Sequence, residues 1–188
     1  MKNFFLKLNT IKTLFLVLII PGLVQLILVN FAQRTNDVKL YSSLFFLFWL
    51  MYFPFFYWLK IAIDFLYSQS KNYFEMNLKY FKISVIINII TLLNFVFFVA
   101  YIFSFLFFNE KPNKDLFLWF FLIQFIGIIS IIYSSNFITI LIKSIELKRK
   151  VKFTEFIGNS IIMLIPPIAI WIIHNKVKEL LNNIKYSD

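Results

Sequence analysis

Long uncharged stretches alternate with short charged segments along the whole chain. Five stretches of 20 to 27 residues contain no Asp, Glu, Lys or Arg: 13–33, 40–59, 83–109, 116–142 and 156–175. An α-helix rises about 1.5 Å per residue, so about 20 apolar residues cross a hydrocarbon core roughly 30 Å thick. Backbone amides inside lipid must bond within their own segment, which favours helices. The pattern therefore predicts transmembrane α-helices.

These stretches predict an all-α fold, a polytopic transmembrane helical bundle that forms one integral membrane domain over residues 1–188. Four full spans are expected at about 13–33, 40–59, 83–108 and 116–142. The first span is expected to be retained, because it is longer than the apolar core of a signal peptide and lacks a small-x-small cleavage site. Pro21-Gly22 and Pro54 are expected to kink the first two spans, which membrane helices tolerate.

The fifth stretch differs from the others because it contains Pro166-Pro167. Proline lacks a backbone donor and restricts the residue before it, which predicts a helix end at Ile165 and a new helix from Ile168 to about Ile184. Segment 156–175 is therefore a broken hydrophobic segment, either re-entrant or a fifth span, followed by an amphipathic tail at 176–185. We expect the re-entrant form, with the polar face of the 83–108 span covering its turn.

The distribution of Lys and Arg predicts the orientation in the membrane. With the N-terminus in the cytoplasm and a re-entrant last segment, 15 of these residues lie on the cytoplasmic side and 4 on the other side. A fifth crossing would change the two totals to 12 and 7. Cytoplasmic loops carry the excess of Lys and Arg. We therefore expect a multipass protein of the cytoplasmic membrane with both termini in the cytoplasm.

Several predictions concern the ends of the spans. Trp58 lies beside Lys60 and is expected at the membrane interface, where tryptophan is enriched. Lys60 and Asp64 are four residues apart, a spacing that allows them to pair on one helix face, but Lys60 is expected instead to extend from the end of the span to the membrane surface. The helix of the fourth span is expected to continue to about Lys150, and Thr154 is the predicted N-cap of the next helix.

Seven uncharged polar residues lie within the third and fourth spans at helical spacing. They are Ser84, Asn88, Thr91, Asn94, Gln124, Ser130 and Ser134. Such residues either form hydrogen bonds between packed helices or line a path for a solute. We favour packing, because small residues at four-residue spacing allow helices to approach closely.

The densest basic cluster follows the fourth span and consists of Lys148, Arg149, Lys150 and Lys152. The chain carries a net charge of +10, which on a soluble protein would suggest nucleic acid. Here 61% of the residues are hydrophobic and the cations lie beside apolar stretches. The cluster is therefore expected to contact anionic lipid head groups, and no nucleic acid is expected as a partner.

The residues that most catalytic sites need are scarce. Cysteine is absent and His174, beside Asn175 and Lys176, is the one histidine, expected at the membrane interface. No Asp, Glu, Lys or Arg lies within the uncharged stretches, whereas proton relays and ion-coupled transporters place such groups inside the membrane. No phosphate-binding glycine loop is present either. We expect no catalytic residue, no metal and no cofactor.

These observations favour a non-enzymatic structural or accessory protein that acts through helix packing, with another membrane protein or a second copy of itself as partner. A channel or facilitator for a neutral or lipophilic solute, lined by Asn88, Thr91, Asn94 and Gln124, is the main alternative. A third alternative is a lipid-handling protein that uses the basic cluster.

Three segments carry a resemblance to a known group of proteins. The basic segment IKSIELKRKVKFTEFIG at 142–158 is followed by PPIAIWII at 166–173, and MNLKYFKI occupies 76–83. This layout resembles uncharacterised small multipass membrane proteins of Bacteroidota-type bacteria. The resemblance implies a bacterial cytoplasmic membrane and transfers no catalytic residue.

Overall fold

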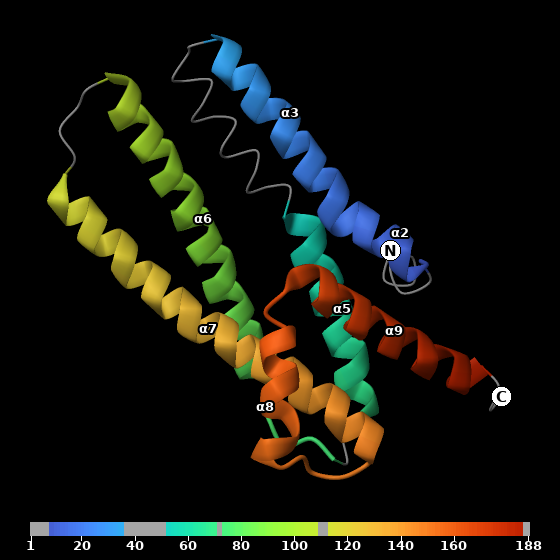
Figure 1. The fold of residues 1–188 in the computed structure, drawn as a ribbon. Coiled ribbons are helices and arrows are strands. Elements are labelled where there is room, and N and C mark those ends of the chain that lie inside the picture. Colours follow the sequence, from blue (N-terminus) through green and yellow to red (C-terminus); the bar gives the residue numbers. More distant parts are fainter. Residues whose placement is uncertain (1–7, 36–51, 71–72, 109–112, 186–188) are drawn as a thin grey trace.

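A computed structural model describes residues 8–35, 52–70, 73–108 and 113–185 of the chain. Every regular element in these ranges is a helix, which confirms the predicted all-α class (Figure 1). The elements are α2 (Thr10–Leu14), a π-helical turn η1 (Phe15–Ile19), α3 (Ile20–Thr35), α5 (Phe53–Gln69), α6 (Leu78–Phe108), α7 (Lys114–Leu147), α8 (Phe153–Ile162) and α9 (Pro166–Lys185).

The helices α6 and α7 form a long antiparallel hairpin. Two helical segments in the described ranges, Leu78–Val99 and Asp115–Leu147, are long and apolar enough to cross a membrane. Only 17% of the most apolar window of each is buried, and side chains such as Leu118 and Phe125 are more than half exposed. The core helix of a soluble protein would bury most of such a surface. The hairpin instead presents an apolar exterior.

The first predicted span is one continuous helical rod from Thr10 to Thr35. Its π-helical turn, Phe15–Ile19, ends directly before Ile20-Pro21. Proline removes a backbone donor and crowds the carbonyl four residues earlier, and a wider turn relieves that crowding. The irregularity expected at Pro21 is therefore present as a π turn.

The second predicted span is described only from Tyr52 onward, and residues 36–51 lie outside the described part. The helix α5 continues through Lys60 and Asp64 to Gln69, well past the predicted end at residue 59. Pro54 occupies the first turn of α5, where its missing N–H leaves no helical bond unmade. The kink expected at Pro54 stays a prediction, because the turn before this residue lies outside the described part.

The fifth apolar stretch is divided between two helices. The helix α8 ends at Ile162, and the turn that follows leads directly into Pro166 at the start of α9. The predicted break is present, but α9 begins two residues before the predicted Ile168. Thr154 is not the N-cap of α8, because Lys152 holds that position and its backbone N–H donates to Glu155 Oε2 at 2.8 Å. At about 15 Å, α8 is much shorter than a hydrocarbon core.

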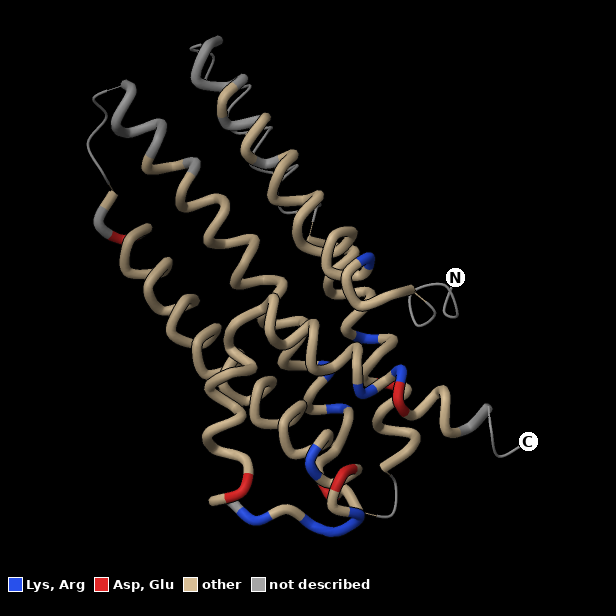
Figure 2. The backbone as a smooth tube through the Cα atoms, turned by 45° about the vertical axis from the view of Figure 1, so that its right-hand side comes forward, with Lys and Arg blue, Asp and Glu red and all other residues tan. Residues whose placement is uncertain are grey.

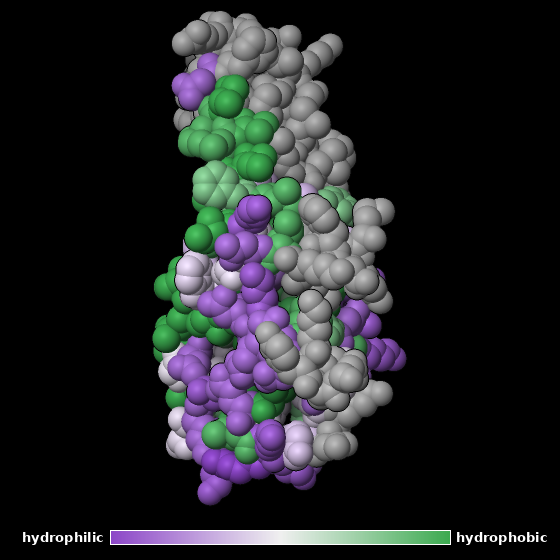
Figure 3. Space-filling view, turned by 90° about the vertical axis from the view of Figure 1, so that its right-hand side faces the viewer, coloured by the Kyte–Doolittle hydropathy of each residue, from purple (hydrophilic) through white to green (hydrophobic). Residues whose placement is uncertain are grey.

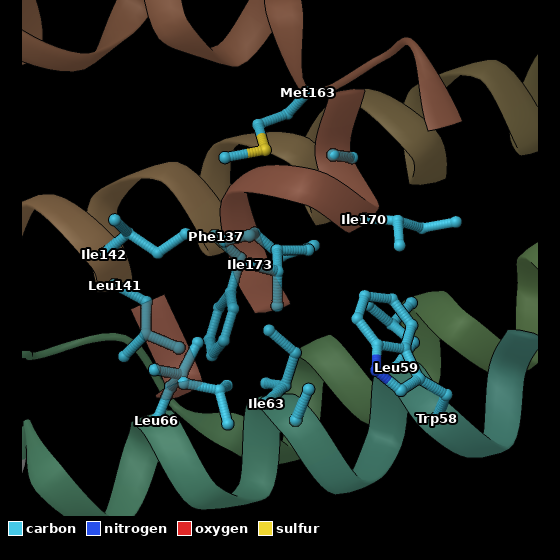
Figure 4. Close-up of a cluster of buried hydrophobic side chains, with 14 of the residues drawn as sticks. Trp58, Leu59, Ile63, Leu66, Phe137, Leu141, Ile142, Met163, Ile170 and Ile173 are labelled. Carbon is cyan, nitrogen blue, oxygen red and sulfur yellow. The ribbon is translucent and has the colours of Figure 1, made fainter. Parts of the chain in front are cut away.

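The buried core lies where α5, α7 and α9 meet beside the start of α6 (Figure 4). Phe137 of α7 is fully buried, with its ring stacked on Phe81 at a centroid distance of 4.6 Å. The ring of Phe74 meets the edge of Phe137 at 4.9 Å. Ile170 and Ile173 of α9 pack into the same cluster opposite Trp58 and Ile63 of α5.

His174 is fully buried rather than exposed at an interface, so that prediction is wrong. Its Nε2 lies 2.8 Å from the carbonyl oxygen of Leu8 and 3.3 Å from Thr13 Oγ1, and its ring centroid is 6.3 Å from that of Trp58. The position falls on the stripe of Ile170, Ile173 and Val177, which α9 turns toward the core. Helical spacing, not the neighbouring charged residues, determines where the imidazole lies.

Charged residues gather at one end of the molecule. Figure 2 shows most described Lys, Arg, Asp and Glu in the lower half of the view, and one acidic residue, Asp115, lies in the first turn of α7 at the far end. On the face drawn in Figure 3, hydrophilic side chains likewise cover the lower part and hydrophobic ones lie above. The upper part of the hairpin is therefore the apolar part.

Truncation of Phe137, the ring at the centre of the core, tests whether buried aromatic packing stabilises the fold more than exposed aromatic side chains do. We expect Phe137→Ala to destabilise the protein strongly, because comparable core truncations cost about 3–5 kcal/mol. Phe121→Ala is the matched control, since Phe121 lies on the same helix with 61% of its surface exposed. Thermal unfolding in detergent should show a large decrease in midpoint for Phe137→Ala only. Equal decreases would contradict the described core.

Candidate functional site

All seven polar residues singled out in the third and fourth spans lie along the interface between α6 and α7. Ser84, Asn88, Thr91 and Asn94 lie on α6, and Gln124, Ser130 and Ser134 lie on α7. Hydrogen bonds connect six of them across the interface, and Thr91 takes part through its backbone carbonyl. We call this interface the polar seam.

The half of the polar seam near the start of α6 contains a series of hydrogen bonds in which each donor can be assigned. Ser84 Oγ donates to the carbonyl oxygen of Phe81 at 2.8 Å, so its single proton is used there. Ser134 Oγ, 2.8 Å from Ser84 Oγ, must therefore be the donor in that pair. Asn88 Nδ2 then donates to Ser134 Oγ at 3.2 Å. The series fixes the amide orientation of Asn88, because Ser134 Oγ can only accept from its nitrogen.

The other half of the seam is built around Gln124. Its Nε2 donates to the backbone carbonyl of Thr91 at 3.2 Å and to Asn94 Oδ1 at 3.1 Å. One turn further along α7, Gly127 faces Thr91 so closely that a Cβ at this position would lie 2.6 Å from Thr91 Oγ1 and 2.8 Å from Thr91 Cβ. The absence of a side chain at Gly127 therefore permits the close approach of the two helices.

A cavity of about 310 Å³ adjoins the seam on the side of α5 and α9. Its wall is mostly apolar and includes Phe55, Leu59 and Ile170, with Asn88 and Ser134 as polar members. Within the described part of the chain, the buried Asn88 Oδ1 has no hydrogen-bond partner. Nε1 of Trp58, another wall residue that is fully buried, has none either. Two residues of the cavity wall thus carry a buried, unmatched polar atom, an acceptor on Asn88 and a donor on Trp58.

The residues that were predicted to line a path for a solute do not all border this cavity. Asn88 borders the cavity, whereas Thr91, Asn94 and Gln124 do not and instead contact one another. Hydrogen bonds inside the seam engage most of these polar groups, but Thr91 Oγ1 and Asn88 Oδ1 have no partner among the described residues. The seam therefore joins α6 and α7 through direct hydrogen bonds, and the cavity lies beside it.

The basic cluster Lys148–Lys152 is partly neutralised within the chain. Arg149 makes a two-pronged ion pair with Glu155, with Nη2 2.6 Å from Oε1 and Nη1 3.2 Å from Oε2. This hydrogen bonding, helped by the Lys152 backbone N–H, holds the pKa of the Glu155 carboxyl below its ordinary value. Lys150 pairs with Glu75, and Lys148 ends α7 in the left-handed conformation with φ of 51°. The loop therefore has a defined shape and retains exposed cations.

Two features of the helix α5 were not predicted from the sequence. Asp64 pairs with Lys82 of α6 at 3.4 Å, whereas the sequence had offered only Lys60 as a possible partner. Trp58 is fully buried rather than interfacial. Its spacing of four residues from Ala62, another fully buried residue, is the sequence signal that indicates a core-facing stripe.

No protein-family model, curated protein or solved structure matches this chain. The resemblance to multipass membrane proteins of Bacteroidota-type bacteria therefore stays a prediction. Among the described residues, no group of three or more His, Cys, Asp and Glu is placed to hold a metal ion. Function must be inferred from the arrangement of the helices and the seam.

The close contact at Gly127 can be tested with a matched pair of glycines. We expect Gly127→Ala to destabilise the hairpin by about 1–3 kcal/mol, the usual cost of overpacking. Gly158→Ala is the control, because nothing lies within 4 Å of a Cβ built on Gly158. Adding Thr91→Ala to Gly127→Ala removes Cγ2 and Oγ1 of Thr91, the two atoms nearest to the new Cβ. The double variant should therefore regain part of the lost thermal stability. A neutral Gly127→Ala would contradict the seam geometry.

Proposed function

We propose that this chain is a multipass integral membrane protein with no chemistry of its own, acting as a structural or accessory component through helix packing. One observation carries the proposal: the exterior of the α6–α7 hairpin is apolar and exposed, while its polar groups face inward and bond one another. Lipid favours this arrangement, because it cannot satisfy polar groups and does not penalise apolar ones. A soluble protein would have the opposite distribution.

The proposed topology has four full spans with the N-terminus and the basic cluster in the cytoplasm. In this topology α6 leaves the cytoplasmic side at Leu78 and α7 returns to it at Leu147. The last apolar segment enters and returns on the cytoplasmic side. The short α8 and the binding of α9 against α2 and α5 support this, as does the Lys and Arg bias.

The polar seam leaves little of its own surface for a partner, since α6 and α7 use it on each other. Contacts with a partner protein or a second copy would therefore involve the apolar exterior of the hairpin. Apolar side chains such as Ile128, Ile129 and Ile132 of α7 are about half exposed there.

Binding of a neutral lipophilic molecule in the cavity beside Asn88 is a second candidate function. Two residues of the cavity wall support it, because each carries a buried polar atom with no partner: the acceptor Asn88 Oδ1 and the donor Trp58 Nε1. An unpaired buried polar group costs about 1–3 kcal/mol, which a ligand carrying a hydroxyl group would recover. The closed seam favours binding over passage through the membrane.

Membrane integration and topology can be tested together, because the chain contains no cysteine. Alkaline carbonate should leave the protein in the membrane pellet. Single cysteines introduced at Asn36 and Asn113 should react with an impermeant thiol reagent applied outside intact cells, and one at Lys150 should react only after lysis. Release by carbonate would overturn the proposal, and external labelling at residue 150 would reverse the topology.

The path of the last segment requires a separate measurement at the C-terminus. A fluorescent protein that matures only in the cytoplasm should glow when fused after Asp188, because a re-entrant segment returns the tail to that side. A phosphatase that is active only outside the cytoplasm should stay inactive in the same fusion. Strong phosphatase activity would indicate a fifth crossing.

A further inference from the structure

A groove between α5 and α6 has a charged end and an apolar end. Its volume is about 340 Å³. Lys60, Asp64 and Lys82 form the charged end, while the remaining wall is aromatic and aliphatic: Phe53, Phe56, Tyr57, Phe81, Val85, Ile86 and Ile89. The groove shares the wall residues Phe56 and Val85 with the cavity beside Asn88, but its charged end belongs to neither that cavity nor the basic cluster at Lys148–Lys152.

The charged end carries more positive than negative charge. Lys82 Nζ lies 3.4 Å from Asp64 Oδ1, so one cation is paired with the one carboxylate of the groove. Lys60 is exposed and adds a second cation on the same wall. Half of the Lys82 side chain, 49%, also remains exposed. An anion between the two ammonium groups would therefore be attracted by both and repelled by one carboxylate.

The two ends of the groove are aligned with the membrane axis of the proposed topology. Lys82 lies in the second turn of α6, and Ile86 and Ile89 follow about 6 Å and 10 Å further along that helix. The helix α5 runs the opposite way, so Phe53 and Phe56 lie beside the deeper part of α6 (Figure 1). The charged end is on the side where the described cations gather (Figure 2). A lipid of that leaflet has the same polarity, with its head group outside and its chains inside.

We propose that this groove binds one anionic phospholipid, whose phosphate lies against Lys60 and Lys82 and whose acyl chain packs along Ile86 and Ile89. A cavity of about 150 Å³ holds benzene, so 340 Å³ accommodates about a dozen carbon atoms of a chain. Lysines at a membrane surface contribute a modest attraction to anionic lipid, and the apolar wall adds chain packing. The inference rests on the proposed membrane location but not on the packing role.

The test uses native mass spectrometry of the full-length protein purified in detergent and incubated with defined lipids. Phosphatidylglycerol should give a one-lipid adduct, and phosphatidylcholine with the same acyl chains should give much less. Lys60→Gln and Lys82→Gln should each weaken phosphatidylglycerol binding about fivefold. Lys79→Gln, the same charge change on the same helix but outside the groove wall, should leave binding unchanged.

Two further variants distinguish a binding site from a merely structural ion pair. Asp64→Asn removes the negative charge and should strengthen phosphatidylglycerol binding, although it breaks the bond to Lys82. Ile86→Trp fills the apolar part of the groove from an exposed position and should abolish the adduct while the protein still melts at the same temperature. Weaker binding by Asp64→Asn would overturn the proposal.

The remaining outcomes separate the sources of the ligand. Equal adducts with both phospholipids, or a loss with Lys79→Gln equal to that with Lys60→Gln, would overturn the inference. Binding of a free fatty acid without binding of phosphatidylglycerol would also overturn it. Carbonate extraction of the same variants keeps the two proposals apart, since a protein that stays in the pellet but binds no anionic lipid refutes only the groove.

Discussion

The structure depends on the close contact between α6 and α7 along the polar seam. Two helices with apolar exteriors gain little from hydrophobic burial when lipid surrounds them, so their association relies on close packing and interhelical hydrogen bonds. Gly127 supplies the close approach to Thr91, and Gln124 and Ser134 supply bonds on either side of it. Both ends of the seam are thus held while the outer faces remain available to lipid.

The order of hydrogen bonds in the seam has a consequence outside it. Because Ser84 donates to its own helix, each donor in the series is fixed, and the series ends with the carbonyl oxygen of Asn88 unmatched. That oxygen borders the cavity that Trp58 also borders. Asn88 therefore takes part in the hydrogen bonds of the seam and also borders the cavity.

The sequence predicted the features that depend on one helix at a time. Uncharged stretches located the long helices, and spacing placed Ser84 and Asn88 on one face, because both follow from the helical period alone. Features that depend on neighbouring helices were missed. The pairing of Asp64 with Lys82 required knowing that α5 lies beside α6, since residue spacing within α5 gave Lys60 as the nearest cation. A charged residue at the end of a stretch also did not end the helix, as the continuation of α5 to Gln69 shows.

The C-terminal segment illustrates the same dependence on neighbours. A chain that turns back within a membrane needs partners for the groups that its broken helix leaves free. The sequence had predicted that the polar face of α6 would supply these partners, but the polar groups of that face bond to α7. The hydroxyl of Ser135 on α7 instead bonds the carbonyl oxygen of Ser160 in α8, and Thr10 of α2 donates to Asn175 of α9 at 2.7 Å. Since α2 and α9 come from opposite ends of the chain, the bond between Thr10 and Asn175 forms only when both ends are assembled.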